Sequence, residues 1–282
     1  MKKTIVIIYS LLIGLSSCMQ DYPKNSEIVV ATYNLRFNNP EDSINAWPNR
    51  KTWVKDLIRF HDFELLGTQE GLIDQITYLA EMEEYGYVGL GRDDGKEAGE
   101  HSAIFYKKER FDVLDHGDFW LSETPLEPSF GWDALKHKRI CSWAKLHDKN
   151  TRMEFFFFSV HYDHQGQIAR VESSKLILRK IDEISKGSPV IFVGDLNSRS
   201  DSEAISILDK QLKDAYKITQ TLPYGPEGTT NNFNWNGAEA NRIDYIYVTD
   251  NISVLKYGCL TDSREKRYPS DHFPVTVTIK IN

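Results

Sequence analysis

The chain has 282 residues, which is long enough for one large domain or two small ones and for a sizeable buried core. Hydrophobic residues make up 40% and charged residues 27%, as in an ordinary globular protein, and the formal net charge is −7. This acidic balance excludes a basic surface over the whole protein that would track nucleic acid, although a local site could still cleave a polyanion.

The first residues have the pattern of a bacterial lipoprotein signal. Lys2 and Lys3 precede an apolar run, residues 4–15, that is too short to span a bilayer. The segment LSSC at residues 15–18 resembles a lipobox, in which the chain is cut before the cysteine and the cysteine is then acylated. An ordinary secretory signal peptide, cut nearby, is the alternative interpretation.

Cleavage before Cys18 predicts a signal peptide over residues 1–17 and a short polar tether over residues 18–26. Lipidated Cys18 would anchor the protein to a membrane of the bacterial cell envelope, facing the periplasm or the cell exterior. Cys141 and Cys259 then remain, and they lack the spacing of a metal site. Whether these two cysteines form a disulfide stays open at this point.

Strand-like and helical patterns alternate along the rest of the chain, and no long polar linker interrupts them. Residues 88–99 and 122–138 are rich in glycine, proline or acidic residues and predict long loops, which are often functional. Two groups of strands with flanking helices indicate one α/β domain with stacked sheets. The predicted strands are 27–33, 64–67, 102–106, 111–116, 118–121, 140–146, 153–160, 190–193, 242–248, 254–260 and 273–281, and the predicted helices are 47–61, 72–82, 165–185 and 201–208, the last capped by Ser200 or Asp201.

The segment PVIFVGDLN, residues 189–197, is the clearest strand of the chain. Its run VIFV is β-branched and aromatic throughout, which predicts a strand buried on both faces. Gly194 ends the run, and Asp195 and Asn197 follow at the carboxyl end, where open α/β sheets bind ligands. Oxygen ligands suit Mg²⁺, but a polar turn would explain the same residues, so the rest of the chain must decide.

Further polar residues lie at or near the ends of the other apolar runs. A single fold could bring such strand-end side chains into one cleft, and this spread-out pattern is more informative than any single motif. The residues are Asn34, Glu70, His161, Asp195, Asn197, Asp244, Asp271 and His272.

A series of short motifs carries a resemblance to a known family. In order along the chain they are Tyr33-Asn34, Gln69-Glu70, Phe105-Tyr106, Val160-His161, Gly194-Asp195-Leu196-Asn197, Arg242-Ile243-Asp244-Tyr245 and Ser270-Asp271-His272. The series resembles the endonuclease/exonuclease/phosphatase superfamily, whose members are deoxyribonuclease-I-like. The resemblance implies a catalytic domain over residues 27–282, folded as a four-layered α/β sandwich with two packed mixed β-sheets flanked by helices. It also implies metal-dependent hydrolysis of a phosphoester bond by an activated water.

Phosphoester hydrolysis needs a positive centre beside the phosphorus and an activated water. By the resemblance, Glu70 is the carboxylate that holds Mg²⁺, with Mn²⁺ as a substitute, and Asn34 and Asp271 lie beside it. Asp195 would orient or deprotonate the attacking water, and Asn197 would hold the geometry.

The remaining residues would bind the phosphoryl group. His161 and His272 would donate hydrogen bonds to oxygens that gain charge in the transition state, and Asp244 would pair with His272. Tyr106 would donate to a phosphate oxygen. Deoxyribonuclease-like relatives place an acid two residues after this tyrosine to support the first histidine, but the chain has Lys108 there, which leaves the partner of His161 undetermined and lowers the expectation of DNA cleavage.

The sequence gives the type of bond more clearly than the substrate. Residues 136–139 (KHKR) and 264–267 (REKR) are the only basic patches, so nucleic acid is possible but not favoured. We expect a monomer that acts on a small phosphorylated molecule or a headgroup, with a phosphodiester preferred over a phosphomonoester. The alternatives are a nuclease acting on DNA or RNA, a sphingomyelinase-like phospholipase, and a non-catalytic binding lipoprotein that retains the fold.

Overall fold

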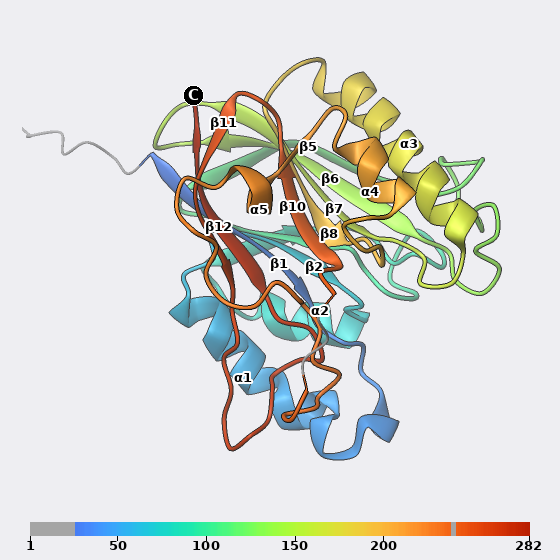
Figure 1. Cartoon of the computed structure of the whole chain (residues 1–282), viewed down its shortest axis with the longest axis vertical. Coiled ribbons are helices and arrows are strands. Elements are labelled where there is room, and N and C mark those ends of the chain that lie inside the picture. The colour runs from blue at the N-terminus through green and yellow to red at the C-terminus, as the bar shows by residue number, and fades with distance from the viewer. Residues whose placement is uncertain (1–25, 238–240) are drawn as a thin grey trace, which may run out of the picture.

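The computed structural model of the protein describes residues 26–237 and 241–282. Two six-stranded sheets pack face to face, and helices cover their outer faces (Figure 1). The predicted signal peptide, Cys18 and the tether as far as residue 25 lie outside the described residues. Within those residues, no helix has the length and apolar character needed to cross a membrane.

The first sheet contains the strand that begins the domain. Its strands β1 and β2 are parallel, and every other neighbouring pair in it is antiparallel. The strand order is β11 (Ile252–Cys259), β12 (Val275–Ile281), β1 (Glu27–Asn34), β2 (Leu65–Gln69), β4 (Ile104–Lys107) and β3 (Tyr85–Val88).

The second sheet is built around the strand that the sequence marks most clearly. Strands β7 and β8 are parallel and the other neighbours are antiparallel, so both sheets are mixed. The strand order is β5 (Phe111–Trp120), β6 (Ile140–Asp148), β7 (Glu154–His161), β8 (Val190–Asp195), β10 (Asp244–Val248) and β9 (Lys213–Asp214). Every residue of β8 is buried, as its apolar run predicts.

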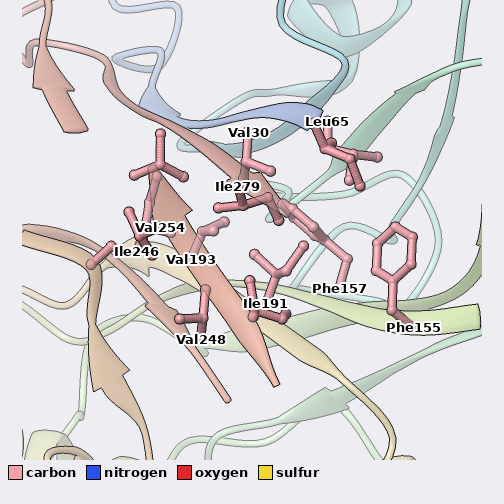
Figure 2. Packing of buried hydrophobic residues seen from close by; sticks show 14 of the residues in the cluster. Val30, Leu65, Phe155, Phe157, Ile191, Val193, Ile246, Val248, Val254 and Ile279 are labelled. Carbon is pink, nitrogen blue, oxygen red and sulfur yellow. The ribbon is translucent and has the colours of Figure 1, made fainter. Parts of the chain in front are cut away.

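The main core lies between the two sheets. Val30 and Leu65 of the first sheet pack there with Phe157, Val193 and Ile246 of the second (Figure 2). Complete burial of an aliphatic or aromatic side chain stabilises a fold by about 1.5–3 kcal/mol. This sheet-on-sheet packing, with helices outside, confirms the predicted four-layered sandwich.

Helices complete the two outer layers. The outer face of the first sheet packs against α1 and α2, and that of the second packs against α3 and α4 (Figure 1). The bounds are η1 (Pro40–Asn45), α1 (Trp47–Phe60), α2 (Ile73–Ala80), α3 (Gln167–Ser185), α4 (Glu203–Leu208) and α5 (Ala215–Ile218).

Two local predictions are wrong. The side chain that caps α4 is Ser202, which accepts a hydrogen bond from the backbone N–H of Ile205, rather than Ser200 or Asp201. The predicted strands 111–116 and 118–121 are one strand, β5, whose register against β6 shifts between Val113 and Asp115. The predicted break falls at Gly117, because glycine is unfavourable inside strands, but this glycine pairs with Trp143 and the strand continues through it.

Two glycines allow backbones to approach closely near the ends of the central strands. A Cβ atom on Gly67 would lie 2.4 Å from Cγ2 of Val193, so a side chain there would push the two sheets apart. A Cβ atom on Gly194 would lie 2.1 Å from the carbonyl oxygen of Val160 on the neighbouring strand. Both positions therefore keep β2, β7 and β8 close to one another just before the polar residues that follow them.

Candidate active site

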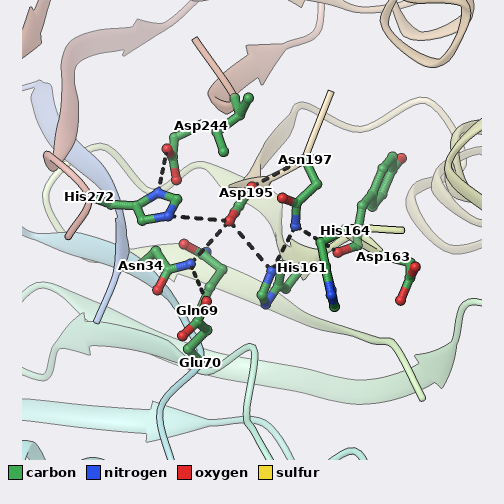
Figure 3. Close-up of polar contacts among 12 residues, drawn as sticks. Asn34, Gln69, Glu70, His161, Asp163, His164, Asp195, Asn197, Asp244 and His272 are labelled. Atoms are coloured by element: carbon green, nitrogen blue, oxygen red, sulfur yellow. Dashed lines mark hydrogen bonds and ion pairs between the residues drawn. The ribbon is translucent and has the colours of Figure 1, made fainter. Parts of the chain in front are cut away.

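The polar residues meet at one edge of the sandwich because of the strand directions. In each parallel pair the carboxyl ends lie together, which joins Asn34 to Gln69-Glu70 in one sheet and His161 to Asp195 in the other. Asp244 begins β10, but this strand is antiparallel to β8, so Asp244 lies opposite Asp195. Figure 3 shows these side chains converging.

Asp195 is the centre of the cluster. Its Oδ2 atom accepts a hydrogen bond from Asn34 Nδ2 at 3.1 Å and lies 3.4 Å from His161 Nε2 and 3.9 Å from His272 Nε2 (Figure 3). Burial raises the pKa of Asp195, and the neighbouring Asp244 carboxylate acts in the same direction. A carboxylate with a raised pKa among polar partners is suited to accept a proton from water.

His272 lies between two carboxylates. Its Nδ1 atom is 2.9 Å from Oδ2 of Asp244, on the side opposite Asp195. Burial alone would lower the pKa of His272, but the charges of Asp244, Asp195 and Asp271 outweigh burial and raise the pKa well above its ordinary value. The ring is therefore protonated at neutral pH and can offer a hydrogen bond from Nε2 toward the cleft.

His161 differs from His272 in its protonation. Burial, and then the charge of Arg139, lowers the pKa of His161 to about 3, so the ring is neutral. The amide nitrogen of Asn197 faces the carbonyl oxygen of Tyr162 at 3.1 Å and His161 Nε2 at 3.0 Å, so it donates to both and Nε2 accepts. The ring hydrogen is then on Nδ1, and Oε2 of Glu100 lies 3.6 Å from that atom. Glu100 is therefore an acidic neighbour of His161, but this distance is beyond that of a hydrogen bond, and Nδ1 is buried without a hydrogen-bond partner among the described residues.

Glu70, Asn34 and Asp271 form the oxygen-rich part of the site. Glu70 accepts hydrogen bonds from Asn34 Nδ2 and the backbone N–H of Phe37, both at 3.1 Å, but forms no salt bridge with any described residue. Its φ of 62° places it in the left-handed region, a strained conformation that is common at functional sites. Burial raises the pKa of Asp271, and Glu70 acts in the same direction. Glu70 thus lacks a salt bridge among the described residues, whereas Oδ2 of Asp271 lies 3.7 Å from Arg36 Nε, and the oxygens of both carboxylates fit a hard divalent cation.

A second group of possible metal ligands lies nearby. Single ligand atoms of Asp195, Asp244 and His272 all lie within 4.8 Å of one another, and all three residues are buried. However, His272 Nδ1 already makes a 2.9 Å hydrogen bond with Asp244, whereas its Nε2 lies 3.9 Å from Asp195, beyond hydrogen-bond distance. The bond to Asp244 occupies one of the possible ligand atoms of each of these two residues, so we assign the metal to the first group.

Tyr106 does not join the cluster, so the expectation that it donates to a phosphate oxygen is wrong. In β4 it lies opposite Leu65 at the start of β2, whereas Glu70 follows the end of that strand. Its side chain packs against the core between the sheets. Burial raises the pKa of Tyr106, and the charge of Asp112 acts in the same direction. Because β4 is antiparallel to β2, the tyrosine is carried toward the opposite end of the sheet.

The site opens into a cleft of about 430 Å³ that includes residues that the sequence did not single out as functional. His161, Asp195 and His272 form its floor with Glu70, and further polar side chains form its walls. The two predicted long loops signalled part of these walls, since His137 lies in the second loop and Glu100 and Arg139 directly follow the first and the second. The wall residues are Arg36, Phe37, Glu100, His137, Arg139 and His164.

Comparisons with known proteins find similarity over most of the chain. A sequence model of the Endonuclease/Exonuclease/phosphatase family matches residues 31–272. The structure of the Bacteroides thetaiotaomicron VPI-5482 mannosyl-6-phosphatase Bt3783 is 44% identical, with a TM-score of 0.86 over 89% of this chain and 99% of that one. An endonuclease/exonuclease/phosphatase protein from Bacteroides vulgatus is 36% identical, with a TM-score of 0.86 over 92% of this chain and 100% of that one.

Two curated relatives are more distant. Both are uncharacterized proteins of Acanthamoeba polyphaga mimivirus that are 25% identical to this chain, which spans 30% of the length of one and 63% of the other. The family match covers most of the chain and includes every residue of the converging cluster. The chain therefore belongs to the endonuclease/exonuclease/phosphatase family.

Proposed function

We propose that the protein is a metal-dependent phosphoesterase whose substrate is a small phosphorylated molecule, with a phosphomonoester of a sugar as the favoured class. The observation that carries the proposal is the position of Asp195. This carboxylate lies between the protonated ring of His272 and the side-chain amide of Asn34, which also donates a hydrogen bond to Glu70. The relative described as a mannosyl-6-phosphatase supports a monoester. It argues against the diester preferred from the sequence alone.

Glu70, Asn34 and Asp271 would hold the metal, with Mg²⁺ as the favoured ion. When bound, a divalent cation supplies positive charge beside the phosphorus and the leaving oxygen. Carboxylate and carboxamide oxygens are the ligands that Mg²⁺ prefers, and it keeps several waters, so few protein ligands are needed. The lack of a salt bridge to Glu70 from the described residues is the structural support for this assignment.

The remaining residues would position water and stabilise charge. Asp195 would take a proton from the attacking water, and His272 would donate to a phosphoryl oxygen that becomes more negative in the transition state. Asn197 links Asp195 to His161. Its backbone N–H donates to Asp195 Oδ1 at 2.9 Å, and its side-chain amide donates to His161 Nε2. His161 already accepts at Nε2 here, so His272 is the better candidate for the donor.

The experiment that tests the proposal measures phosphate release from mannose 6-phosphate and p-nitrophenyl phosphate, and p-nitrophenol release from bis-p-nitrophenyl phosphate, in Mg²⁺, Mn²⁺ or EDTA. We expect metal-dependent turnover of the monoesters that is lost in Glu70→Gln. Glu83→Gln, which changes an exposed carboxylate in the turn between α2 and β3, is the matched control. Turnover that persists in EDTA would refute the metal assignment, and turnover of the diester alone would refute the monoester.

A readout that does not depend on turnover separates metal binding from catalysis. Mg²⁺ should raise the melting temperature of the wild type and of Glu83→Gln, because a ligand that binds only the folded state stabilises it. Glu70→Gln should lose most of this shift. Metal binding without hydrolysis of any of the three substrates would favour the alternative of a binding lipoprotein.

We also propose that the protein is held at the bacterial cell envelope through lipidated Cys18. The support is the sequence pattern alone: the two lysines, the short apolar run and the lipobox-like segment before the cysteine. Mass spectrometry of the N-terminal peptide should find an acylated Cys18, and Cys18→Ser should release the protein from the membrane fraction. An unmodified N-terminus at another cleavage position would support an ordinary secretory peptide instead.

A further inference from the structure

One wall of the cleft consists of two arginine–histidine pairs outside the catalytic cluster. Arg92 Nη2 lies 3.1 Å from His137 Nδ1, and Arg139 Nη2 lies 2.9 Å from His164 Nδ1. The two imidazole rings are 5.6 Å apart between centroids. His137 and His164 line the same cleft as Asp195 and His272. Figure 3 shows His164 beside His161, on the side away from His272.

The arginines determine which nitrogen of each histidine carries the hydrogen. A guanidinium group can only donate hydrogen bonds, so Nδ1 of His137 and Nδ1 of His164 must both accept. The ring hydrogen is therefore on Nε2 in each case. Burial, followed by the charges of Arg92 and Arg139, lowers the pKa of His137, which agrees with a neutral ring. The wall thus holds two imidazole N–H donors whose orientation is set by buried arginines.

The charges of this wall are already balanced. Arg92 donates to Glu100 Oε2 at 2.5 Å, and Arg139 donates through Nε to Asp163 Oδ2 at 3.3 Å. Two guanidinium groups thus face two carboxylates, which leaves no net charge to attract a second anionic group of a substrate. Neutral donors in a charge-balanced wall suit neutral acceptors such as hydroxyl oxygens.

A further donor remains at the same wall. Arg139 Nη1 is buried and makes no hydrogen bond within residues 26–237 and 241–282. Arg139 also faces a small cavity that it shares with Glu70 and His161. A buried donor without a partner costs free energy unless water or a ligand satisfies it. Nη1 lies 3.9 Å from Glu100 Oε2, beyond hydrogen-bond distance, so this donor of the wall remains available to water or a ligand.

We propose that His137 and His164 bind hydroxyl groups of the substrate, and that this part of the substrate is a polyol such as a sugar ring. The inference rests on the proposed phosphoesterase function, because it places the phosphate at Asp195 and His272. The sugar would extend from there past His161 to the two histidines. A six-membered ring carries several hydroxyl groups and can present two of them to donors at this separation. His137 and His164 then determine specificity without taking part in the reaction.

The test compares a substrate that has hydroxyl groups with one that lacks them. We expect the ratio of kcat/KM for mannose 6-phosphate to kcat/KM for p-nitrophenyl phosphate to fall about fivefold in His137→Ala and about fivefold in His164→Ala. The change should lie mainly in KM. His137→Gln keeps an N–H donor and should recover part of the ratio. His116→Ala removes an exposed histidine elsewhere on the sandwich and is the matched control.

Each other outcome overturns the inference. An unchanged ratio would show that the histidines do not contact the sugar, and an equal loss on both substrates would place them at the phosphate or in the fold. A bisphosphorylated hexose that binds the wild type more tightly than mannose 6-phosphate, with the gain lost in the variants, would make the wall an anion site.

A binding measurement distinguishes failure of this inference from failure of the proposed function. If the wild type hydrolyses neither monoester, calorimetry with mannose 6-phosphate can still test whether His137 and His164 bind the sugar. Binding that is weakened about fivefold by His137→Ala, but not by His116→Ala, would support the sugar site without the activity. Absence of binding to the wild type would overturn the sugar site.

Discussion

Asp244 begins β10 of the second sheet and His272 lies just before β12 of the first, yet Oδ2 of the carboxylate is only 2.9 Å from Nδ1 of the ring. Because β10 is antiparallel to β8, Asp244 also lies opposite Asp195 at the end of β8. Asp244 thus holds the ring with Nε2 toward Asp195 and keeps it protonated. The carboxylate acts on the reaction through the histidine, as a positioning residue.

Asp244→Asn should therefore lower kcat about 10²- to 10³-fold, because an amide cannot stabilise the imidazolium form. The carboxylates of Asp244 and Asp195 raise the pKa of His272, so removing one charge lowers that pKa. In the variant the ring is protonated only at lower pH, and the residual activity should increase as the pH falls. Asp250→Asn, at an exposed position, is the control. A pH profile identical to that of the wild type would contradict this role.

Glu100→Gln should lower kcat about tenfold, because Oε2 of the carboxylate lies 3.6 Å from Nδ1 of His161 and its charge favours the tautomer that carries the hydrogen on Nδ1. Glu97→Gln changes an exposed residue of the same loop and should have no effect. Steady-state kinetics on p-nitrophenyl phosphate checks both variants. Glu100→Asp should recover part of the activity if the carboxylate positions His161. Equal loss in Glu100→Gln and Glu100→Asp would point to a structural role in the loop instead.

Asp148→Asn should reduce the free energy of unfolding by about 2–3 kcal/mol at pH 7, because it breaks a buried ion pair. Arg110 donates to Asp148 through Nε and Nη2, at 3.2 and 2.9 Å, and both residues are buried. Glu64 still accepts from Arg110 in the variant, which limits the loss. Urea unfolding measures the difference.

The same pair predicts how stability depends on pH. Burial alone would raise the pKa of Asp148, but hydrogen bonds from Arg110 and the Asn150 backbone outweigh it and hold the pKa below its usual range. A depressed folded-state pKa gives stability that is present above the unfolded value, about 3.9, and is lost as the pH falls through the folded value. The difference between wild type and Asp148→Asn should therefore be largest near neutral pH and shrink below about pH 4. A difference that stays constant would show that the charge is not its cause.

Cys141 and Cys259 should not react with a thiol reagent in the folded protein. Both are buried free thiols, in β6 and β11 of different sheets. Burial raises the pKa of Cys259 to about 12 and raises that of Cys141 well above its ordinary value, so little thiolate is present. Labelling followed by peptide mass spectrometry should find both thiols modified only after denaturation. A peptide pair joined by a disulfide would contradict this assignment.

Much of the fold could be predicted from local sequence because its strands have unusually clear apolar patterns. The run VIFV at residues 190–193 has no polar residue, and such a run is stable only where both faces of a sheet are covered. The polar residues that follow Tyr33, Gly194 and Val160 were placed at strand ends by the same reasoning. Their convergence then required only that the parallel strands share an edge.

The tertiary structure alone decided which of these residues meet and what completes the site. Tyr106 lies within a predicted motif, but the antiparallel pairing of β4 with β2 carries it away from Glu70. Glu100, Arg139 and His137 come from loops whose path depends on contacts far along the chain, as between Arg139 and Asp163. Local patterns encode the period of a strand and the residue that ends it. They do not encode the long-range ion pairs that fold a loop back over the cleft, and these determine the walls that face the substrate.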